Sequence, residues 1–262
     1  MNMITTSADA LSTAVYPSLN RKRVLVTGGA SGIGAGLVEA FVAQGAEVAF
    51  LDIAEAEGEA LVQKFANQTT PPRYYRCDLT DLNALQQTLR RIAADIGPVQ
   101  ILVNNAANDD RHTLADITPE YWEERMNVNL RHQLFCAREV APAMAAAGGG
   151  AIINFGSISW HLGLPGLVLY ETAKAAIEGM TRALARELGP DGVRVTCVVP
   201  GNVKTPRQER WYTPEGEQEI LDAQCLKRRI EPAHVASLVL FLASDDAKMC
   251  TGHEYWIDAG WR

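Results

Sequence analysis

The sequence has few cysteines, and they lie far apart. The five are Cys77, Cys136, Cys197, Cys225 and Cys250, an odd number without a C-x-x-C pair. A disulfide-stabilised secreted domain would instead carry a dense, even set of cysteines at short spacings. The pattern therefore indicates reduced thiols, mostly in core positions, and a cytoplasmic protein.

Long apolar runs and a leader-like segment are also missing. No apolar run approaches the roughly 20 residues of a membrane-spanning helix, so we expect no membrane partner. Residues 1–20 lack the basic stretch and apolar core of a secretory signal, and we expect them to form an N-terminal arm. No linker rich in proline, serine or charge divides the remainder, which predicts a single domain over residues 21–262.

Positive charge and clustered histidines are scarce as well. The net charge is −7 and the isoelectric point is near 5.3, which disfavours nucleic acid or an anionic membrane surface as the main partner. The five histidines form no H-x-x-x-H pair and no cluster with carboxylates, so we expect no catalytic metal.

A glycine-rich loop is the first positive signal. Residues 23–27 predict a buried strand, residues 35–43 predict a helix, and the loop between them reads Gly-Gly-Ala-Ser-Gly-Ile-Gly. Glycines there let the backbone approach a pyrophosphate, which then lies on the N-terminus of the helix. The spacing departs from G-x-G-x-x-G, and alone the loop could be only a strand-to-helix turn. The nucleotide-binding residues expected from it are Gly28, Ser31, Gly32, Ile33 and Gly34.

A carboxylate follows the second predicted strand, residues 47–51. Asp52 can accept hydrogen bonds from both hydroxyls of an adenosine ribose, and it would repel a 2′-phosphate. Neither the glycine loop nor Ile53 supplies a cation for such a phosphate, so NAD is favoured over NADP. Asp52 could also cap the helix that starts at Ala54, and one carboxylate can do both.

Strands and helices continue to alternate along the chain. The third strand, residues 73–77, ends at Asp78-Leu79, which could bind an adenine or could form a turn. The fourth, residues 99–103, ends at Asn104-Asn105-Ala106. Such alternation predicts a Rossmann-like, doubly wound α/β fold: one parallel sheet of about seven strands with helices on both faces. The polar residues so far all follow strand ends, where such sheets bind ligands.

A tyrosine and a lysine lie four residues apart on a predicted helix that ends near Leu188. Tyr170 and Lys174 therefore leave the same face of that helix. A phenol has a reference pKa of about 10, which a nearby ammonium lowers. Ser157, at the end of the fifth strand, could bind the same substrate oxygen. This set predicts a general base with its tuning cation, although the two side chains could simply share a half-exposed helix face.

These motifs together resemble the short-chain dehydrogenase/reductase family, from about Lys22 to the C-terminus. The motif residues, in chain order, are Gly28, Gly32, Gly34, Asp52, Asp78, Asn105, Asn129, Ser157, Tyr170, Lys174 and Pro200. The departure is Ala107, where the family usually has glycine. The resemblance implies Asn129, Ser157, Tyr170 and Lys174 as the catalytic set. The cofactor contacts that it implies beyond the glycine loop are Asp52, Ile53, Asp78, Leu79, Asn105, Ala106, Tyr170, Lys174, Pro200, Val203 and Thr205.

Further stretches, at residues 108–112, 155–164, 198–205, 211–217 and 253–262, resemble members of the family that oxidise aldoses with NAD. This implies oxidation of an aldose at C1, with D-xylose as the expected sugar, by a homotetramer. A helical lid is expected at about residues 205–228. The candidate sugar contacts are Asn108, Ser157, Trp160, His161, Tyr170, Asn202 and Trp211, several of which could equally be packing residues.

Three other readings stay open. The substrate could be L-arabinose, a hexose or another secondary alcohol. A 3-oxoacyl reductase is disfavoured, because Asp52 opposes NADPH and the polar loop at residues 108–112 opposes an apolar groove. A catalytically silent dinucleotide-binding protein would have no need of the complete set Asn129, Ser157, Tyr170 and Lys174.

Overall fold

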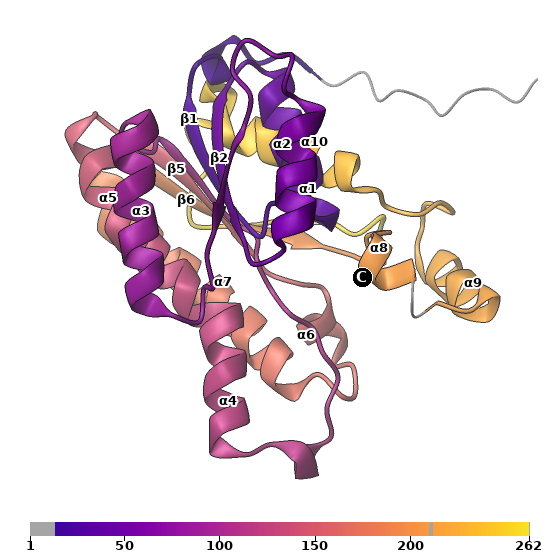
Figure 1. The fold of residues 1–262 in the computed structure, drawn as a ribbon. Coiled ribbons are helices and arrows are strands. Elements are labelled where there is room, and N and C mark those ends of the chain that lie inside the picture. Colours follow the sequence, from indigo (N-terminus) through magenta and orange to yellow (C-terminus); the bar gives the residue numbers. More distant parts are fainter. Residues whose placement is uncertain (1–13, 210–211, 262) are drawn as a thin grey trace, which may run out of the picture.

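A single parallel sheet of seven strands forms the centre of the protein (Figure 1). The computed structural model describes residues 14–209 and 212–261. The strand order is β3-β2-β1-β4-β5-β6-β7, which confirms the predicted doubly wound fold. The strands are β1 (Arg23–Thr27), β2 (Glu47–Asp52), β3 (Arg73–Arg76), β4 (Ile101–Asn104), β5 (Gly150–Phe155), β6 (Val193–Pro200) and β7 (Glu254–Ile257).

Helices cover both faces of the sheet. One face carries α1 (Gly32–Ala43), α2 (Glu55–Lys64) and α10 (Pro232–Ala243). The other carries α3 (Leu82–Ile96), α5 (His132–Ala146) and α7 (Val168–Leu188). Four shorter helices, α4 (Pro119–Met126), α6 (Ser159–Leu162), α8 (Pro206–Glu209) and α9 (Pro214–Ala223), lie toward the ends of the strands that carry the polar motifs (Figure 1). No helix in the described residues is both long and apolar enough to cross a bilayer.

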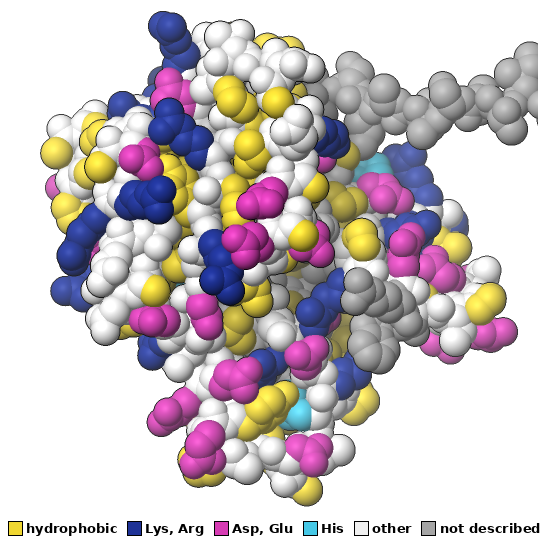
Figure 2. Space-filling view, viewed as in Figure 1, with side chains coloured by type: hydrophobic (Ala, Val, Ile, Leu, Met, Phe, Trp, Pro, Cys, Tyr) yellow, Lys and Arg dark blue, Asp and Glu magenta, His cyan; other side chains and the backbone are white. Residues whose placement is uncertain are grey.

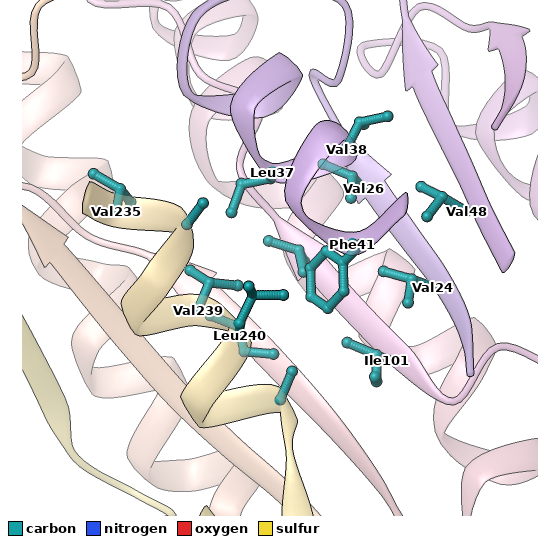
Figure 3. Packing of buried hydrophobic residues seen from close by; sticks show 14 of the residues in the cluster. Val24, Val26, Leu37, Val38, Phe41, Val48, Ile101, Val235, Val239 and Leu240 are labelled. Carbon is teal, nitrogen blue, oxygen red and sulfur yellow. The ribbon is translucent and has the colours of Figure 1, made fainter. Parts of the chain in front are cut away.

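Apolar side chains of β1, α1 and α10 form one buried cluster, which holds α1 against the sheet. Phe41 and Leu37 of α1 pack against Val239 of α10 and the strand residue Val24 (Figure 3). Burial of each such side chain contributes about 1.5–3 kcal/mol. Gly36 allows the two helices to meet, because a Cβ there would lie 2.8 Å from Cβ of Pro232. This packing holds the start of α1 at the end of β1.

The helical stretch between β4 and β5, which the sequence predicts as one helix around residues 121–144, is interrupted. Between α4 and α5 the chain forms one π-helical turn, η3 (Asn127–Arg131). A π-helical turn adds a residue to the helix and turns the following side chains to a new direction. Asn129 lies in this turn and is fully buried. Its side chain binds the backbone of Asn108, in the loop after β4.

The end of the predicted N-terminal arm contacts the domain. Leu19 is fully buried, and the Tyr16 backbone N–H donates to Oε1 of Gln44 at 2.8 Å. Residues 1–13 lie outside the described part of the chain. On the face in Figure 2, acidic side chains gather over α4 and α9, on either side of the region that holds the polar motifs.

Candidate active site

Two adjoining clefts open beyond the carboxyl ends of the strands. The first has a volume of about 530 Å³ and runs along the glycine loop and the ends of β2 and β3. The second has about 840 Å³ and lies between α6, α8 and the loop after β4. The residues that line both are Ile33, Asp109, Gly156, Tyr170, Pro200, Thr205 and Arg207. Tyr170 therefore stands where the two clefts meet.

The glycine loop forms a close backbone cradle in the first cleft. Gly28 has a φ of 65°, and a Cβ there would lie 2.8 Å from Cα of Ala106. A Cβ on Gly34 would lie 1.8 Å from the Gly28 carbonyl oxygen. Ser31 precedes α1 without capping it through its side chain, so the helix N-terminus remains open to an anion. This geometry fits a dinucleotide pyrophosphate.

Asp52 joins the cradle to the next helix. Its Oδ2 accepts from the Ala30 N–H of the glycine loop, and its Oδ1 accepts from the Ala54 N–H before α2, each at 3.0 Å. Asp52 and Ile53 both line the first cleft. The carboxylate therefore holds the backbone just before α2, but it does not cap the helix as considered from the sequence, because the N-cap residue is Ala54 and no side chain caps it. Asp52 also faces the space for a nucleotide. Ile53 is 65% exposed and brings no cation there.

The first cleft gathers nearly all the expected cofactor residues. Those that line it are Gly28, Ser31, Gly32, Ile33, Gly34, Asp52, Ile53, Asp78, Leu79, Asn105, Ala106, Tyr170, Lys174, Pro200 and Thr205. Val203 lines the second cleft instead. Ala107, the departure from the family pattern, also lines the first cleft, so its methyl group leaves this space open.

The predicted base and its lysine lie together, but the electrostatics differ from expectation. Nζ of Lys174 lies 5.4 Å from the Tyr170 ring centroid and donates to the Phe155 carbonyl oxygen at 2.8 Å. Burial raises the pKa of Tyr170 and Asp109 raises it further, whereas a hydrogen bond with Ser157 and the charge of Arg207 lower it. The expected net lowering of this pKa is therefore wrong for the protein alone, because loss of solvation and the charge of Asp109 outweigh the effects of Ser157 and Arg207. Burial also lowers the pKa of Lys174 to about 8.

Asn129 holds the loop that separates the two clefts. Its Oδ1 accepts from the Asn108 N–H at 2.8 Å, and its Nδ2 donates to the Asn108 carbonyl oxygen at 3.0 Å. The π-helical turn therefore aims this side chain at the loop after β4. Asn108, expected to contact the sugar, lines the first cleft.

Amide side chains also join β4, β5 and α7 behind the clefts. Asn104 and Asn154 face each other in register, and Nδ2 of Asn104 donates to Oδ1 of Asn154 at 2.9 Å. Nδ2 of Asn154 donates in turn to the Thr181 hydroxyl at 3.0 Å. All three residues are fully buried.

Trp160 and His161 do not form the sugar-binding surface expected of them. Nε1 of Trp160 donates to Oε1 of Glu178 at 2.8 Å, and Nε2 of His161 lies 2.9 Å from the same oxygen. The His161 ring also packs on Trp256, with ring centroids 4.3 Å apart. Both residues thus attach α6 to α7, because a nearly buried carboxylate needs hydrogen-bond donors. This corrects the prediction for both residues.

The second cleft contains the other sugar candidates that the structure describes. Ser157, Tyr170 and Asn202 line it, whereas Trp211 lies outside the described residues. Oδ1 of Asn202 accepts from the Tyr212 hydroxyl at 2.6 Å and from Nη2 of Arg229 at 2.8 Å. Because the carbonyl end of the amide is engaged, its NH₂ end is the part available to a ligand.

Sequence reasoning missed the charged residue of α8. Arg207 and Gln208 line the second cleft and bind Asp109 of the loop after β4. The loop at residues 108–112 was noted as unusually polar, but its partners lie almost a hundred residues further along the chain. No local spacing could have linked the two segments.

Known proteins share both this fold and this order of motifs. A family profile described as enoyl-(acyl carrier protein) reductase matches residues 28–262. The chain belongs to the short-chain dehydrogenase/reductase family.

Particular relatives narrow the comparison. The chain is 69% identical over 252 residues to a D-xylose 1-dehydrogenase of Caulobacter vibrioides, covering 96% of this chain and 100% of the relative. It is 46% identical over 252 residues to a probable galactose dehydrogenase of Rhizobium meliloti, covering 95% and 98%. Among solved structures, a blue fluorescent protein from a metagenomic library, in complex with NADPH, superposes with a TM-score of 0.86 at 33% identity. That match covers 93% of this chain and 99% of the other.

Proposed function

We propose that this protein oxidises D-xylose at C1 to D-xylonolactone with NAD. The observation that carries the reaction type is the position of Tyr170, which lines both clefts and so can reach a substrate in one and a dinucleotide in the other. The sugar is inferred from the 69% identity to a protein named D-xylose 1-dehydrogenase. The 46% identical galactose dehydrogenase makes a hexose the second candidate.

The first cleft supports NAD as the cofactor. The open N-terminus of α1 and the glycine loop would hold the pyrophosphate, and Asp52 would hold the adenosine ribose. The 2′-phosphate of NADP would be disfavoured, because Asp52 would repel it and the neighbouring Ile53 has no charge to bind it. Bound NAD would supply the hydride acceptor. Lys174 would hold the second ribose.

Tyr170 would act as the general base. Its phenolate would take the proton from the C1 hydroxyl as the C1–H bond breaks and the C1 carbonyl forms. Ser157, whose hydroxyl lowers the pKa of Tyr170 and lies 2.8 Å from the Ser159 hydroxyl, would orient the same substrate oxygen. Because burial raises the pKa of Tyr170, turnover should increase with pH while the phenol loses its proton. Positive charge on oxidised nicotinamide, added to that of Lys174, would favour the phenolate.

Asn129 would support this base indirectly. Its amide is occupied by Asn108, so a water that links Lys174 to solvent would have to use a backbone carbonyl of the π-helical turn. The NH₂ end of Asn202 would donate to a sugar hydroxyl. Residues 205–228, with α8 and α9, would form the lid over the sugar.

The assembly and the location also remain proposals. Exposed apolar side chains on α4 and α5, such as Trp122 and Leu134, favour association into the homotetramer implied by the family resemblance. Scattered free cysteines favour the cytoplasm.

One assay tests the function. The purified protein is mixed with NAD or NADP and with D-xylose, L-arabinose, D-galactose or D-glucose, and the absorbance of the reduced cofactor is followed. We expect the highest kcat/KM with NAD and D-xylose. A preference for D-galactose would show that the sugar assignment is wrong while the proposed type of reaction is right. NAD binding without turnover of any alcohol would support the non-enzyme alternative.

A further inference from the structure

A charged cluster ties α8 to the loop after β4 at the junction of the two clefts. Nε of Arg207 donates to Oδ1 of Asp109 at 3.0 Å, and Nη2 of Arg207 donates to Asn108 and Asp110 at 3.0 and 2.6 Å. Nε2 of Gln208 donates to Oδ2 of Asp109 at 3.1 Å. Both carboxylate oxygens of Asp109 are therefore held by residues of α8.

This pair lies beside the proposed base. Asp109, Arg207 and Tyr170 all line both clefts. The two charges act on Tyr170 in opposite directions, since the carboxylate raises its pKa and the guanidinium lowers it. The side chain of Asp109 is 34% exposed and that of Arg207 is 47% exposed, so solvent weakens both effects without removing them.

The other titratable groups around Tyr170 belong to segments outside α8. Lys174 comes from the same helix and binds the Phe155 carbonyl oxygen. Arg111, in the loop of Asp109, binds the Pro165 carbonyl oxygen and lines the second cleft. Tyr212 follows α8 and lines the same cleft. A movement of α8 would thus change the charge near Tyr170 chiefly by removing Arg207 from Asp109.

We propose that Arg207 is a positioning residue that favours proton removal by Tyr170, because it neutralises Asp109 at the junction of the two clefts. When α8 is seated, Arg207 neutralises Asp109, and the phenolate of Tyr170 can form. Without the charge of Arg207, the uncompensated charge of Asp109 would favour the protonated phenol. The population of the phenolate at a given pH therefore depends on the contact between α8 and the loop after β4. This inference rests on the proposed dehydrogenase function.

The pH dependence of kcat tests this coupling with saturating NAD and D-xylose. Arg207→Met should shift the midpoint of the profile upward by about 0.5–1 pH unit, because Asp109 then acts on Tyr170 alone. Asp109→Asn should shift it downward, and the double variant should return close to the wild-type midpoint. Arg207→Lys keeps the charge and should keep the midpoint.

Lys204→Met is the matched control. It removes a cation from the segment just before α8, but the partner of Lys204 is Glu209, at 3.4 Å. Its midpoint should equal that of the wild type. If Arg207→Met lowers kcat with an unchanged midpoint, or if the control shifts equally, Arg207 is only a structural contact and the coupling is wrong.

A second readout separates this inference from the proposed function. The ultraviolet absorbance of tyrosinate is titrated in the NAD complex without sugar, and the signal of Tyr170 is the difference from the same protein carrying Tyr170→Phe. Arg207→Met should shift this titration upward as well. If no aldose is oxidised, the proposed function fails, whereas the titration still decides whether Arg207 acts on Tyr170.

Discussion

The two clefts are built in different ways. In the proposed cofactor cleft, the part around the glycine loop is formed by backbone and short side chains between Gly28 and Ile53, while the other lining residues lie at or after the ends of later strands. The proposed substrate cleft is formed by side chains from the segments that follow β4, β5 and β6, such as Asp109, Ser157 and Asn202. The first design can be deduced from local sequence, whereas the second depends on how distant segments meet.

The largest expected effect is at the junction of the clefts. Tyr170→Phe should lower kcat by about 10³-fold or more, because the general base is lost, while NAD affinity and folding persist. Turnover and NAD binding by fluorescence titration measure the two effects. Tyr75→Phe is the control, since it removes a hydroxyl that binds Asp95. Near-normal turnover by the Tyr170→Phe variant would show that Tyr170 is not the general base.

The next effect isolates the cofactor cleft. Asp52→Ala should weaken NAD binding by about 10-fold or more, because a charged acceptor for the ribose hydroxyls is lost. It should also narrow the preference for NAD over NADP, because the repulsion of a 2′-phosphate is removed. Both are measured as kcat/KM for the two cofactors. Glu55→Ala, which removes a neighbouring exposed carboxylate of α2, is the control. An unchanged cofactor preference would leave Asp52 with only its backbone hydrogen bonds to Ala30 and Ala54.

A smaller effect isolates the substrate cleft. Asn202→Ala should raise KM for D-xylose by about 10-fold with little change in NAD affinity, because one hydrogen-bond donor to the sugar is lost. Gln218→Ala, which removes an exposed amide of α9, should leave both constants unchanged. If the Asn202 variant instead weakened NAD binding and left KM for the sugar unaltered, the assignment of the two clefts would be reversed.

The smallest effect on activity is expected at Glu178. Glu178→Gln should lower stability by about 1–3 kcal/mol, because Trp160 and His161 lose a charged acceptor. kcat/KM for D-xylose should change less than about threefold. Chemical denaturation measures the stability, and steady-state kinetics measure kcat/KM. Glu39→Gln, which weakens the exposed ion pair of Glu39 with Lys64, is the control. A large rise in KM for the sugar would restore Trp160 and His161 as substrate contacts.

The sequence predicted the fold, and most of the residues that it proposed for the cofactor line one cleft, for a physical reason. Apolar strands followed by glycine or a carboxylate define both a sheet and its ligand edge, so Gly28, Asp52 and Asn105 could be placed by position alone. The same reasoning placed Tyr170 beside Lys174, because four residues make one turn of helix. It gave the wrong sign for the pKa of Tyr170, since the desolvation of a phenol depends on the packed structure around it.

Other features depend on tertiary contacts and could not be predicted. The π-helical turn at Asn127–Arg131 interrupts a pattern that is helical on both sides. Trp160 and His161 were placed in the substrate cleft because they follow Ser157, but Glu178 attracts them to α7. Arg207 meets Asp109 only because the segments after β4 and β6 lie side by side.

The buried amides of Asn104 and Asn154 keep two strands in alignment. Asn105 and Ser157 follow directly on these strands, one on the nucleotide side and one on the sugar side. A slip of one residue between β4 and β5 would turn inward side chains outward and would break the hydrogen bond between the two amides. The spacing between the proposed nucleotide and sugar sites would therefore depend on a hydrogen bond inside the sheet that lines neither cleft.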